Sequence, residues 1–366
     1  MPRTSHKNER FVTLLEPMEA LSVETIPVGS EWQYEPKWDG FRCLISRDDN
    51  DVSMLSKSGQ DLQRYFPEIV QAVLMLPKSS FALDGELVLF KDGELSFDVL
   101  LQRLHPARSR VLKLSEQTPA LFLAFDILRV GQRDLGGRPL NVRRPLLQDF
   151  AARSFINNAY FRLSPATDDY ETATRWLQSA GGGSDGVIAK RLDLPYRGGQ
   201  RDGMQKIKLI RSADCVIGGF RYGKNSVGGR SLVGSLLLGL FDEAGKLNYV
   251  GFTSGIKAKD KLALTDKLEK IAADKSFSGK APGRPSRWSS NGASEWQPVK
   301  PKLVIEISYD HVSGGRFRHG TSLIRWRPDK SPRQCTDLQL AQHVAEPVAA
   351  LLADREADFA AMKCDT

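Results

Sequence analysis

Apolar and polar positions along the first 210 residues alternate between strand-like and helix-like spacing. Apolar residues that recur every three or four positions predict helices over 62–76 and 168–180. The second helix would begin at Asp168 or Asp169, because a carboxylate at that position suits an N-cap. Short apolar runs bounded by turn residues predict strands at 31–36, 41–46, 81–90, 121–129, 186–191 and 205–210.

The pattern changes near residue 212, where short strands separated by glycine-rich turns become the rule. One helix is expected over 261–275, and 276–300 is expected to be a long exposed loop. The number of strands suits a five-stranded oligonucleotide-binding barrel. Strands are predicted at 214–222, 234–241, 247–252 and 303–309, and a final amphipathic helix at 344–361. The sequence therefore predicts an α+β protein with domains at 1–210 and 211–335 and a helical tail at 336–366.

Charge and cysteine usage restrict the class of protein. The 366 residues have a net charge of +8, and residues 281–335 alone have a net charge of +6. Such a cluster suits a nucleic-acid backbone, although a solvated basic surface would look the same. Apolar runs are too short to cross a bilayer, and the polar first ten residues do not resemble a secretory signal. The four cysteines are scattered, without metal-binding spacing, which favours a reducing cytoplasm.

The candidate chemistry centres on the stretch Glu35-Pro36-Lys37-Trp38-Asp39-Gly40-Phe41-Arg42. Lys37 follows a predicted strand and precedes a glycine turn, where the backbone can approach a ligand closely. A lysine two residues before Asp-Gly is common by chance and would ordinarily be a solvated turn residue. The rest of the sequence changes this interpretation.

This stretch resembles the nucleotidyl-transfer motif of DNA ligases, RNA ligases and mRNA capping enzymes. Further stretches resemble the other motifs of that superfamily in the expected order, across residues 10–335. The sequence is most similar to the small stand-alone ATP-dependent DNA ligases of bacteria that are linked to end joining. The further stretches are Ser56-Lys57-Ser58-Gly59, Asp84-Gly85-Glu86, Ala124-Phe125-Asp126, Asp185-Gly186-Val187-Ile188-Ala189-Lys190, Lys206-Ile207-Lys208 and Arg325-Trp326-Arg327-Pro328-Asp329-Lys330.

The resemblance implies an adenylation domain followed by an oligonucleotide-binding (OB) domain, and an enzyme that seals 5′-phosphate, 3′-hydroxyl breaks. Lys37 would take AMP from ATP and pass it to the DNA 5′-phosphate. Glu35 and Phe125 would bind adenine, and Glu86 and Asp185 would bind ribose or a Mg²⁺ or Mn²⁺ ion. The resemblance assigns phosphate contacts to Arg42, Lys190, Lys206, Lys208, Arg325, Arg327 and Lys330, and we expect DNA contacts from Lys57, Arg221, Lys224, Arg316 and Arg318.

The chemistry of an amine nucleophile agrees with this assignment. A free lysine titrates near ~10.4, yet only a neutral amine attacks phosphorus. Neighbouring cations and burial both favour the neutral form and would also bind the triphosphate. Three positions depart from the family pattern: Asp185 replaces a glutamate, Met204 a tryptophan and Lys57 an arginine. The shorter reach of Asp185 weakens the case for direct metal binding there.

The expected partners are nicked or broken duplex DNA and end-joining repair proteins, and no membrane association is expected. The expected state is a monomer in the cytoplasm. An RNA ligase or a capping-type guanylyltransferase is the alternative within the enzyme class. A catalytically inactive DNA-binding module is the alternative outside it. Retention of Lys37, Glu86, Lys206 and Lys208 counts against that last reading.

Overall fold

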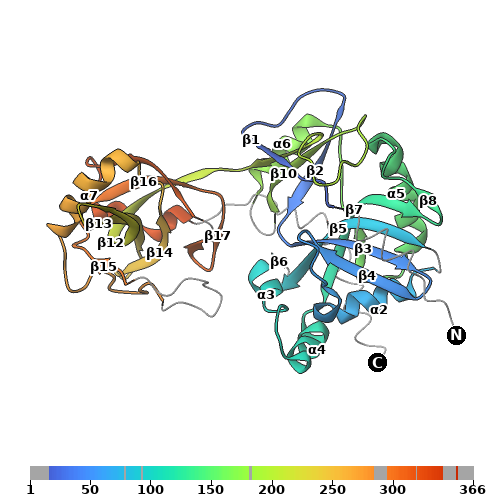
Figure 1. Ribbon diagram of the computed structural model, residues 1–366, viewed down its shortest axis with the longest axis horizontal. Helices are drawn as coiled ribbons and strands as arrows, with labels where there is room; N and C mark the ends of the chain where they lie inside the picture. The colour runs from blue at the N-terminus through green and yellow to red at the C-terminus, as the bar shows by residue number, and fades with distance from the viewer. Residues whose placement is uncertain are drawn as a thin grey trace. The chain divides into compact units, whose positions relative to one another are not determined.

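The computed structural model describes residues 16–77, 80–91, 94–180, 184–283, 295–318, 320–340 and 352. The chain divides into two compact units, and the division falls between Leu209 and Ile210. Each unit has its own sheets and its own hydrophobic core (Figure 1). The mixture of mainly antiparallel sheets and helices agrees with the predicted α+β class.

The first unit is built on two mainly antiparallel sheets, and each strand predicted in this part of the chain is present. One sheet has the order β1-β11-β10-β2, with bounds Leu21–Val23, Met204–Lys208, Ser184–Arg191 and Trp32–Trp38. The other has the order β4-β3-β5-β7-β8, with bounds Asp51–Ser56, Phe41–Asp48, Phe81–Lys91, Ala120–Val130 and Arg133–Asp134. Two short strands extend the second sheet, β6 (Glu94–Leu95) beside β5 and β9 (Phe161–Leu163) beside β7.

Helices pack against both sheets of the first unit, and α6 (Tyr170–Gln178) contacts β10 and β2 of the four-stranded sheet. The predicted helix over 62–76 is a short 3₁₀ turn, η1 (Gln63–Tyr65), followed by α2 (Pro67–Met75). The helix predicted over 168–180 is α6, whose Asp169 cap accepts two backbone N–H bonds. Two further helices, α3 (Phe97–Leu101) and α4 (Arg108–Gln117), were not predicted.

The longest helix among the described residues, α5 (Leu140–Ser154), was also missed. Its buried face includes two arginines, which interrupt the apolar stripe that predicts a helix. Arg143 forms an ion pair with Asp126 at 2.8 Å, and Arg144 donates to the carbonyl of Ser164 at 2.7 Å. Partners distant in sequence therefore make these buried charges tolerable, and the local pattern does not contain that information.

The second unit is built on one six-stranded sheet, with a helix packed against it and a separate two-stranded hairpin. The sheet has the order β14-β13-β12-β16-β19, with β15 beside β12, and α7 contacts β13. The predicted helix over 261–275 is shorter than expected, since α7 ends at Glu269. The bounds are β12 Arg211–Val227, β13 Arg230–Phe241, β14 Leu247–Thr253, α7 Lys261–Glu269, β15 Gln297–Pro298, β16 Val304–Tyr309 and β19 Ser322–Trp326.

Most described residues of the predicted loop at 276–300 are exposed, as expected, but two of its aromatic side chains pack onto this sheet. The rings of Phe277 and Trp296 meet with centroids 5.6 Å apart, over the adjacent glycines Gly218 and Gly219 of β12. A side chain at either glycine would collide with these rings. The helix predicted over 344–361 lies outside the described residues, apart from Leu352.

Candidate active site

Several predicted nucleotide-site residues share one face of the four-stranded sheet. Strand β10 lies between β2 and β11, so a residue on β10 has one partner on each side. Ile188 pairs with Glu35 on β2 and with Lys206 on β11. Gly186 lies two residues earlier on the same face and pairs with Lys37 and Lys208. This face presents Glu35, Lys37, Lys190, Lys206 and Lys208.

Asp185 lies at a β-bulge that brings its carboxylate to Lys37. The pairing of β10 with β2 shifts register on either side of Asp185. The next residue, Gly186, has φ +144°, and a Cβ there would lie 2.0 Å from the Ile207 carbonyl oxygen, so the bulge requires glycine. Lys37 Nζ donates to Asp185 Oδ2 at 2.9 Å, and Lys208 Nζ lies 3.9 Å from the same oxygen.

The Lys37–Asp185 pair is largely enclosed, since the two side chains are 21% and 7% exposed. An ammonium group held by a carboxylate has no lone pair with which to attack phosphorus. The pair must therefore separate, and the proton must leave, before Lys37 can act as a nucleophile.

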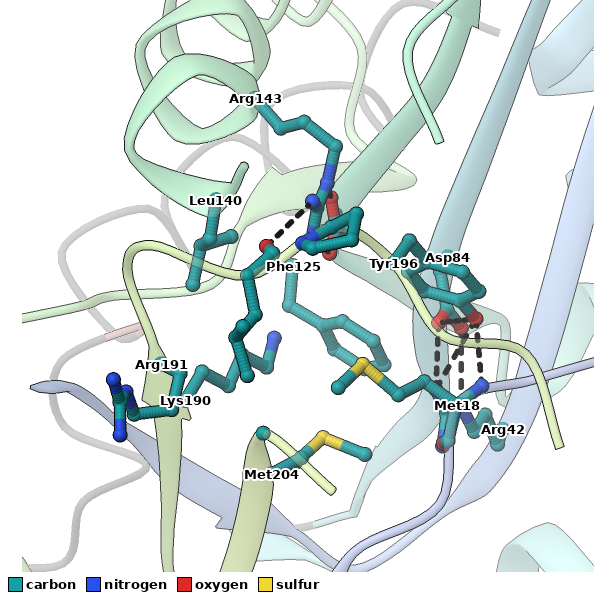
Figure 2. Close-up of a pocket in the computed structure, with 14 residues that line it drawn as sticks. Met18, Arg42, Asp84, Phe125, Leu140, Arg143, Lys190, Arg191, Tyr196 and Met204 are labelled. Carbon is teal, nitrogen blue, oxygen red and sulfur yellow. Dashed lines mark hydrogen bonds and ion pairs between the residues drawn. The ribbon is translucent and has the colours of Figure 1, made fainter. Parts of the chain in front are cut away.

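Phe125 occupies a second bulge, in β7. Asp84 pairs with Asp126 while the next residue, Gly85, pairs with Ala124, which leaves Phe125 as the extra residue. It is partly exposed although its neighbours in the strand are buried. Figure 2 shows its ring in the space that Lys190 and Met204 also line. The Lys190 ammonium lies 4.4 Å from the ring centroid.

Glu35 is buried and fixed by donors on several sides. Its Oε1 accepts from Gln33 Nε2 at 2.8 Å, and its Oε2 accepts from Lys190 Nζ at 2.8 Å. Arg144 NH1 lies 4.0 Å from Oε1. Because each carboxylate oxygen can accept two hydrogen bonds, Glu35 retains acceptor capacity for a further donor such as an exocyclic amine.

Arg42 is held in a network on the opposite wall. Its guanidinium makes a two-pronged contact with the buried Asp84, at 3.1 and 2.7 Å, and Tyr196 Oη donates to the same carboxylate at 2.7 Å (Figure 2). Burial raises the pKa of Tyr196 well above its usual range, so it stays protonated. On the neighbouring strand β5, Glu86 is the cross-strand partner of Arg42.

Burial raises the pKa of Glu86 to about 8, against the opposing effects of Lys37 and Arg42. A carboxyl that titrates near 4.5 when unfolded and near 8 when folded is harder to ionise in the native state. Its contribution to stability is therefore complete below pH 4.5 and is lost as the pH rises to 8.

Glu86→Gln should therefore stabilise the protein more at pH 9 than at pH 5. The expected difference in the free energy of unfolding is at most about 5 kcal/mol, from the conversion of the pKa difference. Denaturant unfolding of both proteins at the two pH values, without divalent cations, measures it. If the free energies of unfolding of the two proteins differ by the same amount at both pH values, Glu86 ionises normally.

A pocket of about 410 Å³ opens over these residues. It is lined by six cations and three carboxylates, together with apolar groups that include Phe125 and Ile188. The volume falls within the range of small-ligand sites. Its charged lining comprises Lys37, Arg42, Lys57, Lys190, Arg201, Lys206, Glu19, Glu35 and Glu86.

Lys206 shows how strongly the cations act on one another. Its pKa is lowered, first by burial and then by Lys208, Lys37, Lys57 and Arg201. Within the described part of the chain, Lys206 makes no ion pair, in contrast to Lys37 and Lys57. It is thus the cation of the pocket that is most readily available to an incoming anion.

The three cations of the sixth motif meet carboxylates inside the second unit. Arg325 pairs with Glu306 at 2.6 Å, and Lys330 pairs with Asp214 at 2.6 Å. Arg327 NH1 donates to both carboxylate oxygens of Asp214, at 2.9 and 3.0 Å, and Arg327 NH2 donates to Asp329 at 2.8 Å. The three side chains are therefore grouped together, each already neutralised in part.

Two predicted DNA contacts converge on one tyrosine of the second unit. Arg316 lies over the ring of Tyr249, 5.2 Å from its centroid, and the positive charges of Arg221 and Arg316 oppose the rise in the Tyr249 pKa that burial causes. Arg316 follows the turn of a hairpin formed by β17 (Val312–Ser313) and β18 (Arg316–Phe317). Arg318 follows that hairpin, Lys57 lies in the first unit, and the side chain of Lys224 is not among those described.

Two family models match the chain. The ATP dependent DNA ligase domain matches residues 16–208, and the ATP dependent DNA ligase C terminal region matches residues 229–330. DNA ligase C2 of Mycolicibacterium smegmatis is 42% identical over 88% of this chain and 93% of its own length. The chain belongs to the ATP-dependent DNA ligases.

Other relatives of this ligase differ in size. DNA ligase C of Mycobacterium tuberculosis is 39% identical over 88% of this chain and 93% of its own length. The multifunctional non-homologous end joining protein LigD of Mycobacterium bovis is 32% identical over 83% of this chain, which spans 37% of that protein. The ligase thus matches the whole of some relatives and one part of others.

A solved Lig E DNA ligase matches 86% of this chain and 100% of its own, with a TM-score of 0.51 and 16% identity. This similarity concerns the fold alone. With the two family models it confirms the predicted fold, a nucleotidyltransferase domain followed by an OB-fold domain. No helix in the described part of the ligase is both long and apolar enough to cross a membrane.

Sequence reasoning missed several residues that shape the ligase pocket. Glu19 and Arg201 line it from irregular segments, where periodicity gives no signal. Tyr196 and Arg144 act through buried partners that lie far away in sequence. Asp84 belongs to the stretch Asp84-Gly85-Glu86. Because alternate residues of a strand share a face, this spacing could have placed the carboxylates of Asp84 and Glu86 on the same side of the sheet.

Proposed function

We propose that this ligase seals 5′-phosphate, 3′-hydroxyl breaks in duplex DNA through a lysyl-AMP intermediate on Lys37. The principal support is the position of Lys37 in the wall of a cationic pocket, on the sheet face that also presents Glu35, Lys190 and Lys206. An amine surrounded by cations is suited to attack a phosphate that those cations bind and neutralise.

We assign the adenine to the apolar part of the pocket, between Phe125 and Ile188, with Glu35 accepting from its amino group. Arg42, Lys190, Lys206 and Lys208 would bind phosphate oxygens. Lys37 attacks the α-phosphorus and forms a P–N bond as pyrophosphate leaves. AMP then passes to the DNA 5′-phosphate, and the 3′-hydroxyl displaces it to form the phosphodiester.

The two carboxylates Glu86 and Asp185 fit a hard divalent cation, since such ions prefer oxygen ligands. Mg²⁺ or Mn²⁺, when bound, would supply charge that neutralises phosphate oxygens. Glu86 and Asp185 would hold the ion through their carboxylate oxygens, and Lys37 must separate from Asp185 and lose its proton before it attacks. Glu86 would be held in its ionised form.

In the second unit we assign Arg325, Arg327 and Lys330 to the pyrophosphate of ATP, and Arg221, Lys224, Arg316 and Arg318 to the DNA backbone, with Lys57 contributing from the first unit. We take 1–210 as the adenylation domain, 211–335 as the OB-fold domain and 336–366 as a helical tail. The grouping of the three motif cations supports a joint role.

We further propose that the ligase acts as a cytoplasmic monomer in end-joining repair with other repair proteins. The described cysteines Cys43, Cys215 and Cys335 are free and buried, which suits a reducing compartment. Relatives named as non-homologous end joining proteins support the repair role.

A sealing assay tests the proposal directly. Nicked duplexes with all-DNA or all-RNA strands are incubated with Mg²⁺ and either ATP or GTP. We expect sealing of the DNA nick with ATP. Preference for the RNA nick would identify an RNA ligase, and a GTP-dependent adduct without sealing would identify a capping-type guanylyltransferase.

Changing Arg316 and Arg318 together to alanine should weaken nick binding with little dependence on base sequence. Each phosphate contact contributes about 0.9 to the slope of log affinity against log salt, so the slope should fall by roughly 1–2. Fluorescence titrations at several salt concentrations measure this, and adduct formation should persist. An unchanged slope would mean that neither arginine contacts a DNA phosphate.

A further inference from the structure

One wall of the pocket contains a carboxylate held between two cations. Glu19 Oε1 lies 2.8 Å from Lys57 Nζ, and Glu19 Oε2 lies 2.8 Å from Arg201 Nε. Lys57 follows β4 and Arg201 precedes β11, so the three residues come from separate segments. All three line the same pocket as Lys37 and Lys206.

The carboxylate is the more fixed member of this group. Its side chain is 24% exposed, whereas those of Lys57 and Arg201 are 58% and 69% exposed. The backbone N–H of Glu19 donates to the Gln200 carbonyl at 2.8 Å, which holds it beside Arg201. The hydrogen bond from Lys57, followed by that from Arg201, lowers the pKa of Glu19 to about 2. Glu19 is therefore an anion at any physiological pH.

Stability alone gives little reason for this arrangement, because exposed ion pairs contribute little to the free energy of unfolding. The geometry provides a binding position for an anion between Lys57 and Arg201, which we call the anion position. Glu19 places its two carboxylate oxygens there. A terminal phosphoryl group also presents negatively charged oxygens, and its total charge is larger than that of a carboxylate. A terminal phosphate has a charge of about −1.5 to −2 near pH 7, whereas a phosphodiester has one negative charge.

We propose that Glu19 is an internal competitor for the phosphate that this ligase acts on, and that its carboxylate occupies the anion position between Lys57 and Arg201 until a phosphoryl group displaces it. A doubly charged terminal phosphate competes well against one carboxylate. After sealing, the phosphodiester has a single charge, so Glu19 regains the two cations and favours release of the product. This inference rests on the proposed function.

Glu19→Gln tests the competition, since it keeps the shape of the side chain and removes the charge. Binding is measured in EDTA, without ATP, to three duplexes: a 5′-phosphate nick, a 5′-hydroxyl nick and the sealed duplex. We expect affinity for the phosphate nick and the sealed duplex to rise about three- to tenfold, from the loss of two exposed ion pairs. Affinity for the hydroxyl nick should change less than about twofold, because no phosphate enters the anion position.

Glu24→Gln is the matched control, because it removes one exposed charge from the same segment. Equal tightening on all three duplexes would reduce the effect to general electrostatics and overturn the proposal. Weaker binding of the phosphate nick would show that Glu19 positions the two cations instead. A lower KM for ATP with unchanged DNA binding would assign the anion position to the nucleotide and overturn the role of the DNA phosphate.

Sealing by the wild-type protein separates this inference from the proposed function. If the wild-type protein does not seal the DNA nick, the proposed function fails, whatever the Glu19 variant does. If it seals and the Glu19 variant binds all three duplexes as the wild type does, only the competitor role is wrong. The melting temperature of the Glu19 variant should lie within a few degrees of that of the wild type, since only exposed pairs are lost, and Glu24→Gln should melt like the wild type.

Discussion

Lys37→Ala should reduce the covalent AMP adduct below detection, a loss of at least about 10³-fold, because no other group would form the P–N bond. Nick binding should change little, since the phosphate contacts are spread over many other cations. The measurement is retention of label from α-labelled ATP on the protein after denaturation.

Two controls separate the loss of the nucleophile from other effects. Lys37→Arg keeps a positive charge beside Asp185 and should lack the adduct as completely as the alanine variant. Lys113→Ala, on the exposed side of α4, should label like the wild type. Both Lys37 variants should still seal a nick that already has AMP on its 5′-phosphate. A labelled adduct on either Lys37 variant would refute the assignment.

Changing Arg325, Arg327 and Lys330 together to alanine should slow adduct formation about 10²–10³-fold, the usual loss when charge that stabilises a transition state is removed. Sealing of a pre-adenylylated nick should fall less than about tenfold, because pyrophosphate takes no part in that step. Single-turnover rates of the two reactions measure the difference.

Folding must be controlled in this experiment, because Asp214 would lose both of its cationic partners, Arg327 and Lys330. Arg325→Ala loses only a pair with Glu306 from a side chain that is 63% exposed, so it should melt like the wild type and still label slowly. Arg333→Ala, an arginine just beyond the motif, should label normally. Equal slowing of both reactions in the triple variant would indicate a folding defect and contradict the division of labour.

Local sequence patterns predicted the positions of the strands better than the directions of their side chains. Local apolar patterns predicted the strand that contains Phe125 and a strand that ends just before Lys37, whereas β2 continues through Lys37 to Trp38. A superfamily resemblance names both residues. The bulges at Asp185 and Phe125 depend on partner strands far away in the chain. The Lys37–Asp185 pair joins residues 148 positions apart, so no local pattern contains it.

Irregular segments and buried charges were the other source of error. Glu19, Lys57 and Arg201 meet only because three separate segments converge at the pocket. The helix α5 was missed because buried Arg143 and Arg144 look like surface residues until Asp126 and Ser164 are placed beside them. Tertiary partners supply the information that periodicity lacks.

The central claim is that Lys37 accepts AMP from ATP, and one measurement tests it most directly. The wild-type protein is incubated with Mg²⁺ and ATP labelled on the α-phosphate, then digested and mapped by mass. We predict one acid-labile AMP group on the peptide that contains Lys37, released on addition of pyrophosphate. Label on another residue, or no covalent label at all, would contradict the account.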